Sequence, residues 1–218
     1  VSISCSSNTR SSSGTGVVID SNGYIVTNCH VVKDAHSIQI RLNDDRNFSA
    51  SIVGTDPVSD LAVLYVAVKA ANAVPQLRQR IVDGKIVEFD YCNIGYTVAL
   101  PDNTFCNCYT ESRMTIEEFF VDAKARQEEA KKHPGFVNPD EDETGLFFCS
   151  CIPWLAFTQC IQPAPIPADT NPRIVFGKYI KEGDKTQMPL HIQCNHALVD
   201  GWHIGEFFRI FQEINDSL

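Results

Sequence analysis

Two different hydrophobic patterns divide this chain near residue 66. From Gly14 onward, five short apolar runs alternate with polar turns: VVID, YIVTNCHVV, SIQIRL, FSASIVG and LAVLYV. Asn22-Gly23 separates the first two runs and Asp44-Asp45 follows the third, and both are typical of hairpin turns. The pattern predicts an antiparallel, half-barrel-like β segment over 14–66 with no helix. Residues 1–13 are Ser-rich and polar, which predicts a flexible lead-in.

Residues 67–218 mix helical and strand patterns instead. VAVKAANAVPQLRQRIV predicts a helix that ends near Pro75, and Thr115 with Glu118 three residues later forms a capping-box signature before a second helix. Strand patterns follow at 146–152, 173–180 and 188–196. A C-terminal amphipathic helix is predicted by apolar residues at helical spacing: Ile204, Phe207, Phe208, Phe211 and Ile214. These alternating elements indicate an α/β domain.

Composition and charge narrow the function classes. The 218 residues are 44% hydrophobic and 21% charged, which is ordinary for a globular protein, and the net charge is −9. Such an acidic chain lacks the basic surface that phosphate groups require, which argues against nucleic acid and anionic membrane as partners. No apolar run reaches the length of a membrane span. No signal peptide is visible at Val1, and the many cysteines, which we expect to be reduced, point to a cytoplasmic protein.

The nine cysteines leave two interpretations open. Their number is odd, and the chain is larger than a typical disulfide scaffold. Cys106-Asn-Cys108 and Cys149-Ser-Cys151 have one residue between thiols, whereas common zinc sites have two or more. Reduced, partly buried thiols and no metal site are therefore expected, with a metal centre as the alternative.

A histidine and an aspartate near strand ends suggest serine-protease chemistry in the first segment. His30 follows an apolar strand and Asp60 lies in DPVSDLAVL, so they could form the base and orienting acid of a triad. GTGVVIDSNGYIVTNCHVV and GTDPVSDLAVL together resemble the first barrel of HtrA/Do-type trypsin-like serine proteases over residues 14–64. The resemblance implies that His30 and Asp60 correspond to two catalytic positions of that family.

The nucleophile of that triad is missing. The family carries its serine in a GNSGG motif on a second barrel, and neither that motif nor any G-x-S-x-G occurs in this sequence. Without a nucleophile and oxyanion donors the pair has no route to acyl transfer. We therefore reject protease activity and interpret both residues as relics.

The segment MPLHIQCNHALVDGWHIGEFF is the second candidate for chemistry. In strand alternation Leu190, Ile192, Cys194 and His196 share one face, which places His196 at the end of an apolar face before the Asp200-Gly201 turn. A neutral imidazole there suits general-base catalysis. The alternative is a hydrogen-bonded core histidine.

The neighbouring motifs favour the catalytic interpretation. H-x-x-x-D-G before an amphipathic helix resembles chloramphenicol acetyltransferases and, more distantly, dihydrolipoyl acyltransferases and peptide-synthetase condensation domains. The first family is also matched, in order and spacing, by ANAVPQLRQRIVDGKIVEFD, GYTV, SCIPW and GKYIKEGDK. The resemblance covers residues 67–218 and implies an α/β two-layer sandwich. It also implies that the helix after the β segment could start before residue 67.

The resemblance implies a reaction and roles for four residues. An acetyl group would pass from acetyl-CoA, as substrate, directly to a hydroxyl of a chloramphenicol-like acceptor. His196 would act as general base and Ser150 would stabilise the oxyanion. Asp200 would be structural, and Tyr179 would lie on the coenzyme side. Family members are homotrimers with active sites between subunits.

This chain departs from the family at three places. Asn195 stands where the family often has a second histidine, and Phe148 stands where relatives are often polar. The family's N-terminal segment, which supplies an arginine partner for Asp200 and aromatic pocket walls, is replaced by the protease-like sequence; Arg10 or Arg46 could substitute. Two hypotheses follow: an active O-acetyltransferase, or an inactive composite or binding protein without a complete acceptor pocket.

Overall fold

The computed structural model describes most of the chain. The residues described are 1–7, 11–18, 23, 25–27, 29–32, 35–52, 61–100, 102, 104–133, 143–166, 168–183 and 185–217.

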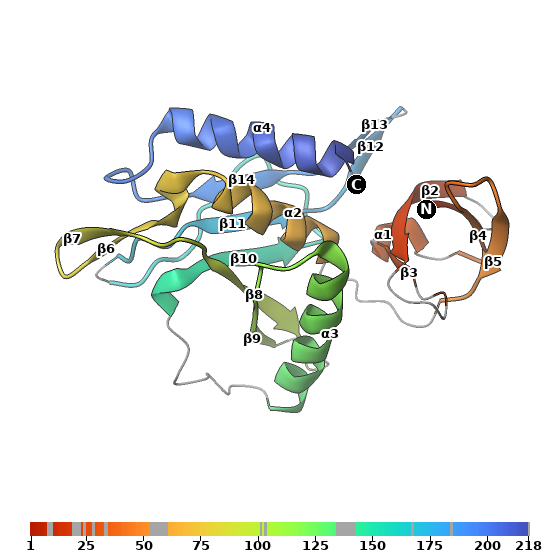
Figure 1. Ribbon diagram of the computed structural model, residues 1–218, viewed down its shortest axis with the longest axis horizontal. Helices are drawn as coiled ribbons and strands as arrows, with labels where there is room; N and C mark the ends of the chain where they lie inside the picture. The colour runs from red at the N-terminus through yellow and green to blue at the C-terminus, as the bar shows by residue number, and fades with distance from the viewer. Residues whose placement is uncertain are drawn as a thin grey trace.

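The N-terminal part is a five-stranded antiparallel sheet that curls around its own small core (Figure 1). Its strands have the spatial order β3-β2-β1-β4-β5. In chain order the elements are β1 (Ser2–Ser6), β2 (Ser11–Val18), β3 (Ile25–Thr27), the short helix α1 (Cys29–Val32), β4 (Ser37–Arg41) and β5 (Asn47–Ala50). The predicted hairpins are confirmed, since β2 pairs with β3 and β4 pairs with β5.

The flexible lead-in predicted for residues 1–13 is wrong. β1 is the central strand of the sheet and β2 pairs with it. Ile3 and Cys5 alternate with serines along β1, and their side chains are 1% and 4% exposed. Their side chains pack in one cluster with Val31 and Val32 of α1 and with Ile38 and Ile40 of β4. The Ser-rich composition concealed this alternation.

The strand predicted at 61–66 is also wrong, because LAVLYV is the start of helix α2 (Leu61–Asn72). Most of the helix is buried, with Ala67, Val68, Ala70 and Ala71 at 0% exposure. A helix that is apolar all round is the expected form of a buried helix. Tertiary packing therefore overrides the β-branched composition of the run. The proposed division of the chain at residue 66 falls inside this helix.

The larger part of the chain forms one mixed sheet with helices on one side. After α2 come the 3-10 helix η1 (Pro75–Arg78), β6 (Gln79–Val82), β7 (Lys85–Glu88), β8 (Asn93–Ala99), β9 (Phe105–Thr110), α3 (Ile116–Lys132) and η2 (Glu143–Gly145). The remaining elements are β10 (Leu146–Ile152), β11 (Arg173–Gly177), β12 (Ile180–Glu182), β13 (Lys185–Gln187), β14 (Leu190–Gln193) and α4 (Gly201–Ser217). The sheet has the order β14-β11-β10-β8-β9, with β10 parallel to both of its neighbours.

One face of this sheet is covered by α2, α3 and α4, and the other face holds the candidate site. A single hydrophobic cluster joins strand residues such as Ile94, Phe147 and Ile174 to Ala67 of α2 and Phe207 of α4. Figure 1 shows α2 and α4 lying along the sheet. The predicted α/β two-layer sandwich is therefore confirmed. No helix in the described part of the chain is long and apolar enough to span a membrane.

The helix start predicted at Thr115 and the predicted C-terminal helix are both confirmed. Thr115 caps α3: its hydroxyl accepts a hydrogen bond from the Glu118 amide at 3.3 Å, and the Glu118 carboxylate accepts one from the Thr115 amide at 3.0 Å. The predicted C-terminal helix is α4, in which Phe207 is fully buried.

Candidate active site

Ser150 lies on the face of the sheet that the helices leave uncovered. It faces Val175 of β11 in the strand register, and Val175 in turn faces His191 of β14. On its other side, the register that pairs Phe148 with Gly95, continued by two residues, places Thr97 of β8 beside Ser150. Thr97 is paired with Asn107 of β9. A row of hydrogen-bonding side chains therefore crosses three adjacent strands at Ser150.

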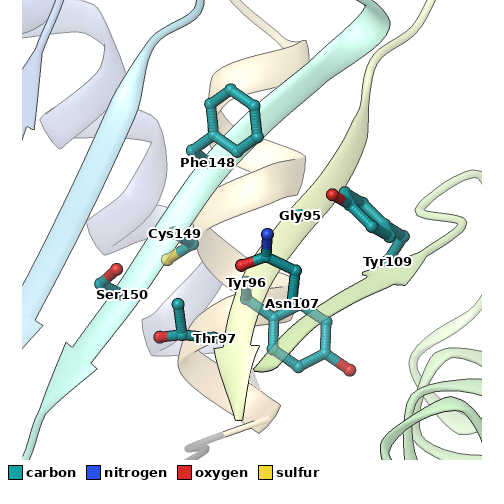
Figure 2. Close-up of a pocket in the computed structure, with 8 residues that line it drawn as sticks. All are labelled: Gly95, Tyr96, Thr97, Asn107, Tyr109, Phe148, Cys149 and Ser150. Atoms are coloured by element: carbon teal, nitrogen blue, oxygen red, sulfur yellow. The ribbon is translucent and has the colours of Figure 1, made fainter. Parts of the chain in front are cut away.

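A shallow hollow of about 60 Å³ lies over this part of the sheet (Figure 2). Figure 2 shows Ser150, Thr97 and Asn107 toward one end, and the rings of Phe148 and Tyr109 toward the other. Gly95 separates the two rings: a Cβ built there would lie 3.1 Å from Tyr109 Cε1 and 3.3 Å from Phe148 Cδ1. The hollow thus combines aromatic walls with a few polar groups, but it is much smaller than typical small-molecule pockets, which hold about 300–1,000 Å³.

The two aromatic walls are held by charged partners. The guanidinium of Arg173 stacks over the Phe148 ring at 5.4 Å from its centroid, and two hydrogen bonds of 2.6 Å tie this guanidinium to Asp169. The Tyr109 hydroxyl donates to Glu143 at 3.1 Å. Cation–π stacking and the charge-assisted bonds fix the ring positions. The apolar Phe148, a departure from the family pattern, is therefore a fixed wall of the hollow.

Cys149, which also borders the hollow, is poorly suited to be a nucleophile. Its side chain points to the helical layer and is 2% exposed. Burial, followed by the nearby Cys151, raises the pKa of the Cys149 thiol well above its ordinary value. Because the thiolate is the nucleophilic form, the buried Cys149 thiol is a poor nucleophile. Ser150, on the opposite face of β10, borders the hollow.

His196 stands on a tight turn between β14 and α4. The Asn195 carbonyl accepts hydrogen bonds from the amides of Leu198 and Val199, both at 3.1 Å, and the Asn195 side chain accepts one from the Ala197 amide at 3.0 Å. The side chains of Leu198 and Val199 are buried. The turn is therefore anchored on one side while His196 itself is exposed.

The turn determines which nitrogen of His196 can act as a base. Nδ1 lies 3.0 Å from the carbonyl oxygen of Val199. Because a carbonyl oxygen only accepts, Nδ1 carries the proton of this bond, and in the neutral ring Nε2 holds the free lone pair. This is the state that general-base catalysis requires.

The strand alternation predicted through His196 is wrong in its last positions. β14 ends at Gln193, so Ile192 and Cys194 face the hydrophobic cluster but His196 does not continue that face. The hydrogen bonds to Asn195 curl the chain out of the strand. His196 is an exposed turn residue.

Asp200 is an exposed helix cap. Its Oδ1 accepts hydrogen bonds from the amides of Trp202 at 2.9 Å and His203 at 3.4 Å, in the first turn of α4. Its side chain is 58% exposed, and the His203 ring nitrogen Nδ1 lies 3.2 Å from Oδ1. Backbone amides of α4 thus stabilise the Asp200 carboxylate.

Ser150 and His196 do not meet within one copy of the chain. Along the Ser150 row the neighbour on β14 is His191, two strand spacings or about 10 Å away. From His191 the chain runs toward the end of the sheet where β10 begins, and His196 lies five residues further, a span of up to about 16 Å. Ser150 on β10 and the turn that carries His196 after β14 are therefore separated by β11 in the sheet.

The remaining predicted residues take different positions. Tyr179 lies between β11 and β12, half-buried against the main hydrophobic cluster. His30 lies in α1, but its side chain and the whole of Asp60 fall outside the described residues. Among the described residues, no group of three or more His, Cys, Asp or Glu side chains could hold a metal ion.

Sequence reasoning missed the neighbours of Ser150 and the histidine beside Asp200. Thr97 and Asn107 reach the hollow through the pairing of β8, β9 and β10, and no local motif encodes that register. His203 was visible in the sequence as the third residue after Asp200, a position at which a side chain can reach back to the cap of a helix.

Comparisons with known proteins concern the family and the fold of the chain. The family model described as chloramphenicol acetyltransferase matches residues 24–212. A chloramphenicol acetyltransferase from Klebsiella sp. is 30% identical over 163 residues, covering 72% of each chain. A solved chloramphenicol acetyltransferase superposes with a TM-score of 0.61 at 24% identity, covering 70% of this chain and 75% of the other.

A second, shorter similarity concerns the other segment. A protein from Marinomonas sp. (strain MWYL1) named "Probable periplasmic serine endoprotease DegP-like" is 51% identical over 57 residues, which are 26% of this chain and 12% of that protein. The family model, in contrast, matches most of the chain. With that match and the superposed fold, the chain belongs to the chloramphenicol acetyltransferase family.

Proposed function

We propose that this protein is an O-acetyltransferase that transfers the acetyl group of acetyl-CoA to a hydroxyl of a chloramphenicol-like acceptor. The observation that carries the proposal is the bond between Nδ1 of His196 and the Val199 carbonyl, since it leaves Nε2 free as a base on an exposed, well-anchored turn. Family membership supplies the reaction class.

In the proposed reaction, Nε2 of His196 takes the proton of the acceptor hydroxyl while that oxygen attacks the thioester carbonyl carbon. A carbon–oxygen bond forms, and the carbonyl oxygen becomes an oxyanion to which the Ser150 hydroxyl donates a hydrogen bond. The intermediate then collapses with cleavage of the carbon–sulfur bond, and the coenzyme thiolate takes the proton back from His196. The products are the acetylated acceptor and free coenzyme A.

The separation of Ser150 and His196 supports a site shared between copies. Each copy would present Ser150 on β10 and His196 after β14, with β11 between them, so a neighbouring copy would complete each site. Head-to-tail contacts of this kind close into rings, of which the trimer expected for the family is one. Tyr179, on the loop after β11, would contact the coenzyme side of that site.

The first experiment measures thiol release from acetyl-CoA with chloramphenicol as acceptor. His196→Ala should lower the turnover rate by about 10²–10⁴-fold, the usual contribution of a general base. Ser150→Ala should lower it by about 10²–10³-fold, as for other oxyanion donors. His133→Ala is the matched control, because His133 lies exposed at the end of α3 beside Glu129. Full turnover by His196→Ala would contradict the proposal.

Mixed assemblies test the shared site. Ser150→Ala and His196→Ala chains, each inactive alone, are coexpressed so that they assemble together. If each site takes its serine from one copy and its histidine from the next, random assembly restores about one quarter of the sites. If both residues act within one copy, the mixture stays inactive.

One observation favours a second candidate function, a protein that binds the coenzyme without turning over an acceptor. The N-terminal strands build their own sheet around their own cluster and add nothing to the main sheet. Relatives use this part of the chain for walls of the acceptor pocket. Saturable acetyl-CoA binding in calorimetry, together with no thiol release for any hydroxyl acceptor, would identify this function.

A further inference from the structure

The peptide group between Val199 and Asp200 connects two imidazole rings. Its carbonyl oxygen accepts the bond from Nδ1 of His196 at 3.0 Å. Its amide, on Asp200, donates to Nδ1 of His203 at 3.1 Å. A continuous chain of hydrogen bonds therefore runs from the His196 ring through one peptide unit to the His203 ring.

His203 is well placed to hold this peptide in orientation. It lies in the first turn of α4 with 21% of its side chain exposed, and its own amide donates to Asp200 Oδ1. The helix fixes its backbone, and the ring accepts the hydrogen bond from the Asp200 amide. Rotation of the peptide would break both ring contacts together. Bonds in such a chain also polarise one another, which strengthens the Val199 carbonyl as an acceptor.

We propose that His203 is a positioning residue for the reaction proposed above: with its proton on Nε2, it orients the 199–200 peptide that holds His196 in its base-competent tautomer. The two histidines then have opposite tautomers, Nδ1–H in His196 and Nε2–H in His203. The competing arrangement is an ion pair, in which a proton on Nδ1 of His203 is donated to Asp200 Oδ1 at 3.2 Å. A proton on Nδ1 of His203 would leave the Asp200 amide without its hydrogen-bond acceptor.

The kinetic test compares two substitutions at one position. His203→Leu removes the acceptor and should lower kcat by about 10–100-fold, as loss of an outer partner of a functional histidine commonly does. KM for both substrates should stay within twofold, because His203 touches neither. His203→Asn should recover most of kcat, because its Oδ1 can accept the same amide hydrogen. Equal kcat values for wild type, His203→Leu and His203→Asn would overturn the proposal, as would a loss confined to KM.

A second readout works even in a protein that has no turnover. Ring-nitrogen NMR of protein carrying ¹⁵N-labelled histidine distinguishes the two neutral tautomers, and spectra of His196→Ala and His203→Asn assign the signals. We expect Nδ1–H for His196 and Nε2–H for His203 in the wild type, and a mixture of tautomers for His196 in His203→Leu. A protonated or Nδ1–H ring at His203 in the wild type would refute the proposal. Absence of turnover with the expected tautomers would refute only the proposed function.

Discussion

Gly177 at the end of β11 provides a direct test of how tightly the loop after β10 packs. A Cβ atom built on Gly177 would lie 2.6 Å from the carbonyl oxygen of Leu155, 2.8 Å from Phe157 Cε1 and 2.9 Å from Pro189 Cγ. The Leu155 carbonyl is fixed by a 2.9 Å hydrogen bond from the Lys178 amide, and the Gly177 amide donates to the Pro189 carbonyl at 2.9 Å. The backbone around this glycine therefore has little freedom to move away.

Gly177→Ala should lower the free energy of unfolding by about 1–3 kcal/mol, the usual cost of forcing one extra carbon into a packed site. Gly205→Ala is the matched control. Gly205 lies inside α4, and no atom comes within 4 Å of the position that its new methyl group would take. The same substitution should therefore stabilise the helix by about 0.5–1 kcal/mol. The same glycine-to-alanine substitution is thus expected to lower the free energy of unfolding at position 177 and to raise it at position 205.

Urea unfolding followed by circular dichroism measures both values, at several protein concentrations so that any change in assembly is separated from folding. The slope of the free energy of unfolding against urea concentration should be equal for wild type and variants. A Gly177→Ala protein as stable as wild type would refute the argument, since the loop would then have room for the methyl group.

Three further predictions concern single side chains and use the same unfolding assay. Asn72→Ala should cost about 1–3 kcal/mol, because it leaves the buried Cys92 amide without the acceptor that now lies at 2.8 Å; a neutral effect would contradict this. Thr115→Ala should cost about 1 kcal/mol by removing the capping box, whereas Thr115→Ser should cost less. Burial raises the pKa of the Cys108 thiol to about 11, above its ordinary value, so the unfolded chain loses this proton at a lower pH than the folded chain. Stability should therefore fall as pH rises from about 9 to 11, and Cys108→Ala should reduce that fall.

The elements that the sequence predicted well are those specified by local signals. The capping box at Thr115 and the apolar face of α4 each lie within a few turns of one helix. The hairpins β2–β3 and β4–β5 were likewise indicated by short turn signals between their strands. These features need no information from distant parts of the chain.

The elements that were predicted wrongly depend on distant contacts. LAVLYV at 61–66 has the composition of a strand, and burial between the sheet and α4 makes it helical. β1 was concealed by its serines, because Ile3 and Cys5 are buried only when β2 and β4 lie on either side. The apolar content of a segment alone does not show which other part of the chain will pack against it.

In the candidate site, too, some residues are placed by local signals and others by contacts between distant strands. His196, Asp200 and His203 lie within eight residues, and their mutual hydrogen bonds follow from one turn and one helix start. The row through Ser150 depends on the register of strands that are tens of residues apart. The sequence could therefore indicate a candidate base but not the walls of the hollow beside Ser150.

Because the chain has two hydrophobic clusters, its two parts can differ in local unfolding under native conditions. The six buried residues of the N-terminal cluster share no member with the cluster beneath the main sheet. Regions of this kind can unfold as separate cooperative units, each with its own opening free energy. Although β1 and β10 are both interior strands of their sheets, β1 belongs to the much smaller cluster. In hydrogen–deuterium exchange, the amides of β1 should take up deuterium well before those of β10.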